Sequence, residues 1–262
     1  MLEILDLVKS YQTKTEKSAK VIETLVLDRI SLQAAEGEFV SIIGPSGCGK
    51  STLFNLISGL EIPEEGQVLL HGKAITGERG HVSYMLQKDL LLPWRTVMDN
   101  CILGMELQGF TRQESRLKAQ ALLEEFGLAA YSKSYPHALS GGMRQRVAFL
   151  RTMLANKEIL LLDEPFGSLD AYTKSEMHEW LMSVWSKYRS MILFITHDIE
   201  EALLLSDRIY VLSSQPARVQ SVLSVNLPRP RSREILVSPE FNQLKKQLLQ
   251  ALFSDKTTPI NI

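Results

Sequence analysis

A glycine-rich stretch between residues 44 and 52 constrains this chain more than any other feature. It reads Gly44-Pro45-Ser46-Gly47-Cys48-Gly49-Lys50-Ser51-Thr52, which fits the spacing G-x-x-x-x-G-K-[ST] of a phosphate-binding loop. Glycines accept positive φ angles and let the backbone approach phosphate oxygens closely. We therefore expect the N–H groups from about Gly47 to Thr52 to converge on one triphosphate. Lys50 should reach its β and γ phosphates, and the Ser51 hydroxyl should ligate Mg²⁺.

The residues on either side of this loop agree with that interpretation. Residues 38–43 form an apolar, β-branched run that is typical of a buried parallel strand. Residues 53–57 continue as a helix with an apolar face, and its amino terminus adds a partial charge of roughly +0.5. The alternative is a Gly/Ser turn with a chance lysine, which the flanking strand and helix disfavour.

Length and composition restrict the class of protein. The chain has 262 residues, 45% of them hydrophobic and 23% charged, which suits one large globular domain or two small ones. The net charge of −1 and the lack of a long basic run give no support for nucleic-acid binding. The longest apolar runs are strand-sized, well short of the roughly 20 residues of a membrane helix. The acidic start argues against a signal peptide, and two cysteines without metal or disulfide spacing favour a reducing cytoplasm.

The order of the predicted strands and helices indicates an α/β fold with a P-loop NTPase core. Strands at residues 2–8, 26–32 and 67–70 should form a small antiparallel subdomain, with an exposed hairpin or loop at 12–20. From residue 39 onward strands and helices alternate, which predicts a largely parallel sheet with helices on both faces. The later strands are expected at residues 81–87, 159–164, 191–195 and 208–212, and the helices at 171–188 and 199–205.

A mostly helical insert is expected at residues 88–156. Its helices are predicted at residues 97–108 and 112–126, and from the glycine pair at 141 and 142 to about 154. A C-terminal segment follows from about residue 216. In it, two prolines and the arginines 229, 231 and 233 form a linker or docking segment before a last helix at 239–253.

An acid pair ends one of the core strands. The apolar run Ile159–Leu162 is followed by Asp163 and Glu164. A carboxylate in the position of Asp163 can hold Mg²⁺ directly or through water. Glu164, one residue further on, points elsewhere and could orient and deprotonate a water in line with the γ-phosphate. The alternative is a helix cap or a turn.

Two further polar residues follow core strands. Gln87 is expected at the carboxyl end of its strand, where open α/β sheets place ligand-facing groups. Its amide could touch the metal or the water and report the γ-phosphate to the helical insert. His197 also lies at a strand end, and it could hydrogen-bond the γ-phosphate and steady Glu164. In isolation, Gln87 would be a surface residue and His197 a structural histidine.

A second glycine-containing motif, Leu139-Ser140-Gly141-Gly142-Met143, precedes a predicted helix. Ser140, Gly141 and Gly142 make a second anion-binding helix start. Because one chain needs only one phosphate cradle, we expect two chains to close face to face. Each would lend this helix start to the ATP bound by the other.

These motifs, together with Arg144-Gln145-Arg146 and Ser168-Leu169-Asp170, resemble the ATP-binding cassette of ABC transporters from about Met1 to Gln215. The resemblance implies an ATPase domain over residues 1–215, with ATP and Mg²⁺ bound at two sites of a head-to-tail dimer. It also implies that Tyr11 stacks on adenine, a contact worth about 1–3 kcal/mol by analogy with base stacking on aromatics. From the residues alone, Tyr11 could equally be a strand-end tyrosine.

The chain departs from the family pattern at two points. Met143 stands where the family often has Gln, but the backbone donors do not depend on that side chain, so we expect function to survive. The polar stretch after Tyr11 looks longer than usual, which bears on the adenine contact rather than on the phosphate contacts.

A finer resemblance involves Leu91-Leu92-Pro93-Trp94-Arg95-Thr96-Val97 with Asp99-Asn100, and Leu227-Pro228-Arg229-Pro230-Arg231. These segments are similar to the ATPases of nitrate, sulfonate and taurine importers; related importers carry thiamine precursors. The resemblance implies a peripheral subunit on the cytoplasmic face of the cell membrane. Its direct partners would be permease subunits, and its indirect partner a substrate-binding protein. The apolar segment beside Gln87 could form a groove for a short permease helix. The alternative is that Leu90, Leu92 and Trp94 pack inside the helical insert.

Three other classes of function fit the sequence less well. For a soluble ABC ATPase that acts on DNA or ribosomes, the sequence offers neither a basic patch nor a coiled-coil insert. A P-loop kinase or GTPase leaves residues 139–142 and His197 unexplained. An exporter cassette normally travels fused to a membrane domain, which this sequence does not contain. The solute is chosen by the permease and the binding protein, so the sequence does not name it.

Overall fold

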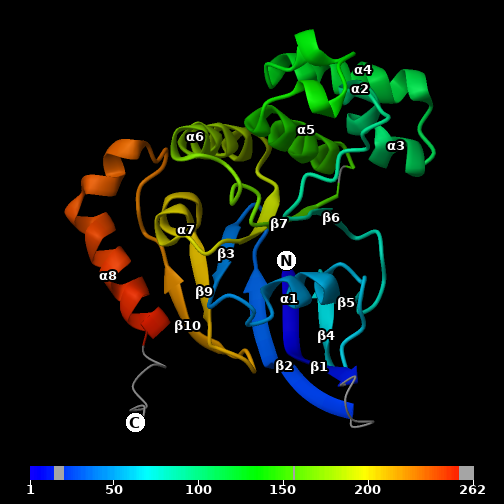
Figure 1. Ribbon diagram of the computed structural model, residues 1–262. Helices are drawn as coiled ribbons and strands as arrows, with labels where there is room; N and C mark the ends of the chain where they lie inside the picture. Colours follow the sequence, from blue (N-terminus) through cyan, green and yellow to red (C-terminus); the bar gives the residue numbers. More distant parts are fainter. Residues whose placement is uncertain (15–20, 156, 254–262) are drawn as a thin grey trace, which may run out of the picture.

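Two β-sheets and a layer of helices make up the computed structural model, which describes residues 1–14, 21–155 and 157–253 (Figure 1). The larger sheet has the strand order β10-β9-β3-β8-β7-β6. Its strands are β3 (Phe39–Ile43), β6 (Val82–Met85), β7 (Ile159–Asp163), β8 (Met191–Ile195), β9 (Arg208–Leu212) and β10 (Val219–Ser224). Neighbouring strands from β9 to β6 pair in parallel, and β10 pairs antiparallel with β9 at the edge. The predicted α/β fold with a largely parallel sheet is confirmed.

The central strands are buried on both faces, which explains their continuous apolar sequences. Every residue of β3, β7 and β8 is buried. Alternate side chains of these strands face different layers. One set packs with helix α6 (Ala171–Tyr188) and the helical insert, and the other packs with α1 (Lys50–Ile57) and the smaller sheet. The carboxyl ends of the strands are therefore held at one edge between two packed layers.

The smaller sheet is antiparallel, as predicted, and has the order β2-β1-β4-β5. Its strands are β1 (Leu2–Lys14), β2 (Val21–Ala34), β4 (Glu65–Leu70) and β5 (Lys73–Ala74). The first strand is longer than the predicted 2–8, so Tyr11 lies within it, opposite Thr24. Residues 12–14 of the expected loop continue β1, and residues 15–20 lie outside the described residues. The sequence did not predict this extension of β1, because residues 9–14 are mostly polar and show no apolar alternation.

The helical insert consists of α2 (Val97–Cys101), α3 (Leu103–Leu107), α4 (Arg112–Glu125) and α5 (Gly141–Leu154), which lie together above the larger sheet (Figure 1). A single helix was predicted over 97–108, but α2 ends at Cys101. The buried Asn100 amide donates to the carbonyl oxygens of Leu92, Arg95 and Thr96. These bonds tie the start of α2 to the preceding loop. The Arg95 guanidinium donates to the Asp99 carbonyl at 3.2 Å, which is the acceptor that residue 103 would use if the helix continued.

The C-terminal segment packs on the larger sheet rather than leaving it. It contains β10, a short 3₁₀ helix at Arg233–Val237 and α8 (Pro239–Phe253), and α8 lies beside α7 (Ile199–Leu205) and β10 (Figure 1). The docking alternative for the proline and arginine segment therefore describes it better than a free linker. The domain boundary after residue 215 stays a proposal. None of the described helices combines the length and the apolar character needed to cross a membrane.

Candidate active site

The phosphate-binding loop connects β3 to the start of α1. Gly49 has a φ of 115°, and a Cβ placed on it would lie 2.8 Å from side-chain atoms of Val26 and of Leu27. Glycine is therefore required there for both conformation and space. No side chain among the described residues caps the amino terminus of α1. Its first N–H groups therefore remain available to an anion.

A cavity of about 400 Å³ lies over this loop. It is lined by Val26, Ser46, Gly47, Gly49, Lys50, Ser51, Thr52, Gln87, Asp163 and Glu164. Gly44, Pro45 and Cys48 belong to the loop but do not line the cavity. The Cys48 side chain instead packs into the core, where burial raises the pKa of its thiol. The Lys50 ammonium donates to the carbonyl oxygens of Gly44 at 3.0 Å and Pro45 at 2.9 Å.

Ser51 and Asp163 face each other across this cavity. Asp163 ends β7 and is buried, and burial raises the pKa of its carboxyl group although a hydrogen bond with Ser51 opposes the shift. The Tyr84 hydroxyl donates to Asp163 Oδ2 at 3.4 Å. A serine hydroxyl beside a carboxylate is an oxygen donor set that fits Mg²⁺.

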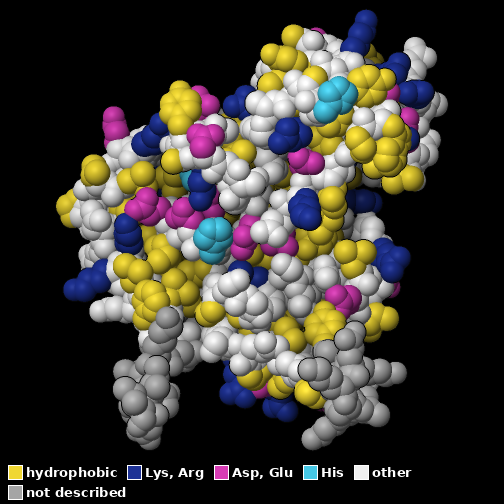
Figure 2. Space-filling model, in the orientation of Figure 1, with side chains coloured by type: hydrophobic (Ala, Val, Ile, Leu, Met, Phe, Trp, Pro, Cys, Tyr) yellow, Lys and Arg dark blue, Asp and Glu magenta, His cyan; other side chains and the backbone are white. Residues whose placement is uncertain are grey.

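The Glu164 carboxylate contacts both Gln87 and His197. Its Oε2 accepts a hydrogen bond from Gln87 Nε2 at 3.1 Å and lies 3.3 Å from His197 Nδ1. Glu164 has a φ of 44°, and its N–H donates to the Ile195 carbonyl at 3.0 Å, which fixes the backbone at the carboxyl edge of the sheet. A second cavity, of about 770 Å³, adjoins this group and is lined by Gln87, Glu164 and His197 among others. The face that holds these residues is hollowed below the helical insert, with acidic and basic side chains gathered around a histidine (Figure 2).

Tyr11 stands apart from the phosphate cavity, on β1. Its hydroxyl donates to Glu61 Oε2 at 2.5 Å, and its pKa is raised by burial and by that carboxylate, against a hydrogen bond with Thr52. The contact with Thr52 places the tyrosine beside the end of the phosphate loop, and 38% of its surface is exposed. A flat, half-open aromatic ring in this position can receive a nucleobase.

Ser140, Gly141 and Gly142 form the start of α5. The Ser140 hydroxyl accepts from the Met143 N–H at 3.3 Å and so caps the helix. A Cβ on Gly142 would lie 2.8 Å from Thr173 of α6, so the helix start requires this glycine. These three residues do not line the cavity over the phosphate loop of their own chain.

Three residues of the site were not predicted: Val26 in the cavity wall, Glu61 against Tyr11, and Tyr84 against Asp163. Alternation along residues 82–87 places Tyr84 on one face of its strand. It does not reveal that β6 pairs with β7 beside Asp163.

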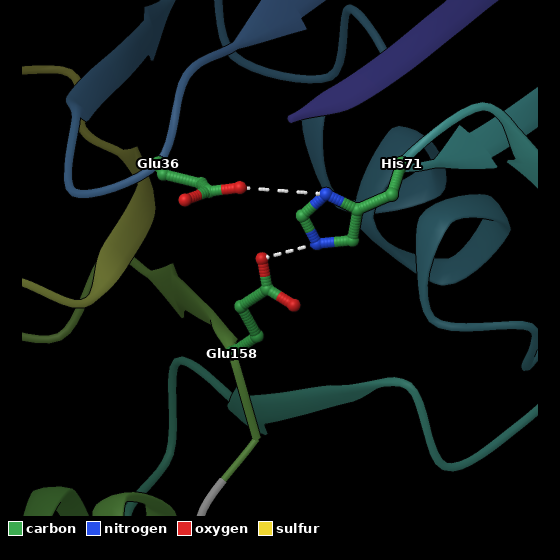
Figure 3. Close-up of side chains that lie close together, drawn as sticks. All are labelled: Glu36, His71 and Glu158. Atoms are coloured by element: carbon green, nitrogen blue, oxygen red, sulfur yellow. Dashed lines mark hydrogen bonds and ion pairs between the residues drawn. The ribbon is translucent and has the colours of Figure 1, made fainter.

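One group of three metal-ligating side chains stands out in the described part of the chain: Glu36, His71 and Glu158 (Figure 3). Glu36 and Glu158 precede β3 and β7, at the edge opposite Asp163. The two carboxylates face different nitrogens of the His71 ring, Nδ1 at 3.4 Å and Nε2 at 2.6 Å. The His71 ring therefore bridges the two carboxylates and joins three turns of the chain.

The fold and the cavity define a nucleotide-binding protein of the P-loop NTPase class. Residues 27–167 match the family model described as ABC transporter. The nitrate import ATP-binding protein NrtD of Synechocystis sp. is 39% identical over 262 residues, covering 98% of this chain and 96% of that protein. The formylaminopyrimidine import ATP-binding protein ThiZ of Halalkalibacterium halodurans is 44% identical over 223 residues, covering 85% and 86%. The chain therefore belongs to the ABC transporter family, and it is an ATPase of the ABC type.

Another relative and two solved structures support the same family assignment. The aliphatic sulfonates import ATP-binding protein SsuB of Bacillus cereus is 39% identical over 246 residues, which are 94% of either chain. Among solved structures, the dimeric structure of MJ0796, a bacterial ABC transporter cassette, matches with a TM-score of 0.74 at 29% identity. That match covers 87% of this chain and 100% of the other. The post-hydrolysis state of the same cassette, bound to ADP and Pi, matches with a TM-score of 0.73 at 28% identity.

Proposed function

We propose that the chain is the energy-coupling ATPase subunit of an importer for a small anionic solute such as nitrate, a sulfonate or taurine. ATP closes a dimer of the chain, closure passes through the residues after Gln87 to a membrane permease, and hydrolysis reopens the dimer. The subunit is then peripheral, on the cytoplasmic face of the cell membrane. A substrate-binding protein is its indirect partner.

The phosphate loop and the edge of the sheet supply the nucleotide contacts in this proposal. The N–H groups at the start of α1 and the Lys50 ammonium bind the phosphates. Ser51 and Asp163, with Gln87 beside them, would hold Mg²⁺, which neutralises charge on the β and γ oxygens when bound. Tyr11 stacks on the adenine ring. Side chains of the protein itself activate the attacking water and donate a hydrogen bond toward the γ-phosphate.

Glu164 acts as the general base in this proposal. Gln87 and His197 both approach its Oε2, which leaves Oε1 to accept a proton from the attacking water. A carboxylate held in this way contributes by orientation as well as by proton transfer. His197 also supplies a hydrogen-bond donor toward the γ-phosphate.

The helix start at Ser140, Gly141 and Gly142 serves the other copy of the chain. Its absence from the lining of the chain's own phosphate cavity supports a site completed across a head-to-tail dimer. A helix amino terminus favours an anion such as the γ-phosphate. The dimeric form of the solved cassette relative is in keeping with this arrangement.

The observation that carries the importer assignment is an exposed apolar segment that adjoins Gln87. Leu90 is 51% and Trp94 72% exposed, whereas Leu91 is buried. The alternative that Leu90, Leu92 and Trp94 all pack inside the helical insert is therefore disfavoured, since only Leu92 of the three is half-buried. Large apolar side chains exposed close together in one segment are typical of a partner contact, and an amphipathic permease helix is the partner that we propose for this segment. A movement of Gln87 would then be transmitted directly to the bound permease helix.

The solute class rests on the names of similar proteins. Relatives named for import of nitrate, aliphatic sulfonates and formylaminopyrimidine occur at 39% to 44% identity. Two of these three solutes are anions, which supports an anionic solute. An importer of a thiamine precursor is the alternative within the same class, and a soluble ABC ATPase without a permease is the alternative outside it.

A pull-down of tagged chain from native membranes in mild detergent tests the assignment, with identification of the co-purifying chains. We expect a polytopic permease, and Trp94→Ala should release it. Leu117→Ala is the matched control, because Leu117 is 76% exposed on α4, in another part of the surface. Ligand screening of the associated binding protein then names the solute. Recovery of soluble partners alone would overturn the importer assignment and leave the ATPase.

A further inference from the structure

Five polar side chains meet beneath the loop that carries His197. Lys174 and His178 come from α6, Thr196 directly follows β8, Asp198 caps the start of α7, and Glu201 lies in its first turn. Glu201 and Thr196 are 3% and 1% exposed. An ionised carboxylate at such depth is costly unless it is paired and hydrogen-bonded. The groups that contact the Glu201 carboxylate therefore indicate its role.

Both oxygens of Glu201 have partners. Oε1 lies 2.7 Å from His178 Nε2 and 3.3 Å from Lys174 Nζ. Oε2 accepts a hydrogen bond from the Thr196 hydroxyl. The carboxylate thus joins α6, α7 and the end of β8 at one point. Removing it would leave the His178 ring nitrogen and the buried Thr196 hydroxyl without their partner.

The same cluster holds the residues on both sides of His197. The Thr196 hydroxyl also accepts the N–H of Asp198 at 3.0 Å, and Lys174 donates to Asp198 Oδ2 at 2.8 Å. The backbone of His197 is therefore fixed before and after the residue, while its side chain projects toward Glu164. Phe166, two residues after Glu164, packs edge-on against the His178 ring with centroids 5.4 Å apart. The cluster thus contacts both segments that meet in the Glu164–His197 pair.

We propose that Glu201 is a positioning residue for ATP hydrolysis. It binds no nucleotide. Through Thr196, Lys174 and His178 it holds the His197 loop so that Nδ1 of His197 stays beside the Glu164 carboxylate. This inference rests on the roles proposed above for His197 and Glu164.

The Glu201→Gln variant tests the proposal, because it keeps the size of the side chain and removes the charge. We expect kcat to fall about 10- to 100-fold, the size of effect that a misplacement of about 1 Å produces. The KM for ATP should stay unchanged, since the cluster does not line the phosphate cavity. Thr196→Val is a second variant that removes only the hydroxyl, and Thr196→Ser should restore kcat. All rates are compared below the lowest melting temperature of the set.

Ser206→Ala is the matched control. Ser206 closes the other end of α7 and shares a buried hydroxyl contact with Ser41 of β3. The Ser206→Ala substitution therefore removes a buried polar contact at the end of the same helix and does not alter the His197 loop. We expect its melting temperature to fall while kcat is retained, whereas the kcat loss in Glu201→Gln should exceed anything that its stability explains.

A double-mutant cycle with His197→Ala decides between positioning and general damage. If Glu201 acts through His197, adding Glu201→Gln to His197→Ala lowers kcat no further. If the fold-losses in kcat of the two single variants multiply in the double variant, the inference is overturned. An unchanged kcat in both Glu201→Gln and Thr196→Val would also overturn it. Full turnover in His197→Ala would overturn the proposed role of His197 and this inference together. A large loss of kcat in His197→Ala beside an unchanged kcat in both Glu201→Gln and Thr196→Val would overturn this inference alone.

Discussion

The carboxylate of Glu164 and the amide of Gln87 are joined by a hydrogen bond of 3.1 Å between Oε2 and Nε2. The bond crosses from the end of β7 to the segment that leaves β6. It connects the residue proposed to activate water with the residue that begins the exposed apolar segment. A glutamine in place of Glu164 can still accept this hydrogen bond, but it cannot take a proton.

Glu164→Gln should therefore leave ATP binding intact and lower turnover by about 100- to 10,000-fold, the usual contribution of a general base. An ATP-bound dimer should accumulate, which size-exclusion chromatography with ATP detects. Glu158→Gln is the control, because Glu158 stands at the opposite end of the same strand beside His71. Unchanged turnover in Glu164→Gln would remove this residue from the catalytic role.

Lys50→Ala should weaken ATP binding itself. The Lys50 ammonium is buried in the loop, and its charge-assisted bonds to phosphate are each worth about 1.5–3 kcal/mol. We expect the Kd for ATP to rise roughly 10- to 100-fold, as measured by titration calorimetry. Lys73→Ala removes an exposed lysine from β5 and should leave the Kd unchanged. Equal affinities of wild type and Lys50→Ala would contradict the assignment of the phosphate loop.

The sequence predicted those parts of the structure whose physical cause lies in consecutive residues. The phosphate loop is set by three glycines and a lysine in one turn, and β7 and β8 are short apolar runs that end in polar residues. By contrast, the pairs Tyr84–Asp163, Tyr11–Glu61 and His178–Glu201 join residues from different elements. Such pairs depend on strand order and helix packing, which the local pattern does not encode.

The strand β10, which the sequence did not predict, and the break after α2 have different causes. β10 is an edge strand in which four of six residues are half-buried and two are exposed, so its sequence lacks clear alternation. Residues 97–108 do have helical periodicity, but the Arg95 guanidinium donates to the Asp99 carbonyl, the acceptor that residue 103 would use in a continuous helix. A side-chain hydrogen bond to the backbone overrode a local preference in that case.

Acid should weaken the helical insert through Asp99. Burial opposes ionisation of Asp99, but hydrogen bonds from Arg112, Arg116 and Thr96 outweigh it and lower its pKa from 3.8 to about 2. Because the folded-state pKa lies below the unfolded value, ionised Asp99 stabilises the fold at neutral pH. That contribution is lost as the pH falls from about 4 to about 2.

We expect Asp99→Asn to lower the free energy of unfolding by about 1 kcal/mol at pH 7, allowing for solvent screening of the exposed arginines. Urea unfolding at a series of pH values measures the difference from wild type, which should shrink toward pH 2. In an Arg112→Met, Arg116→Met background the same substitution should cost less. A difference that stays constant from pH 7 to pH 2 would show that the charge of Asp99 is not its source.

Arg231 holds the C-terminal segment to the end of α7. Its guanidinium is buried and donates to the carbonyl oxygens of Leu203, Leu204, Ser206, Val225 and Leu227. Burial, and then the nearby Arg229, lower its pKa to about 10, against the attraction of Asp207. Arg231 therefore remains charged at neutral pH. A methionine fills similar space but offers these carbonyls no donor.

Arg231→Met should destabilise the protein by at least about 3 kcal/mol, since each buried polar group left without a partner costs about 1–3 kcal/mol. Chemical unfolding of the full chain measures this. Arg233→Met is the matched control: Arg233 is exposed and pairs with the exposed Glu179 at 2.7 Å, so its loss should change stability by no more than about 0.5 kcal/mol. Equal effects of the two substitutions would mean that water or a shifted backbone satisfies the five carbonyls, and that the buried guanidinium does not anchor the segment.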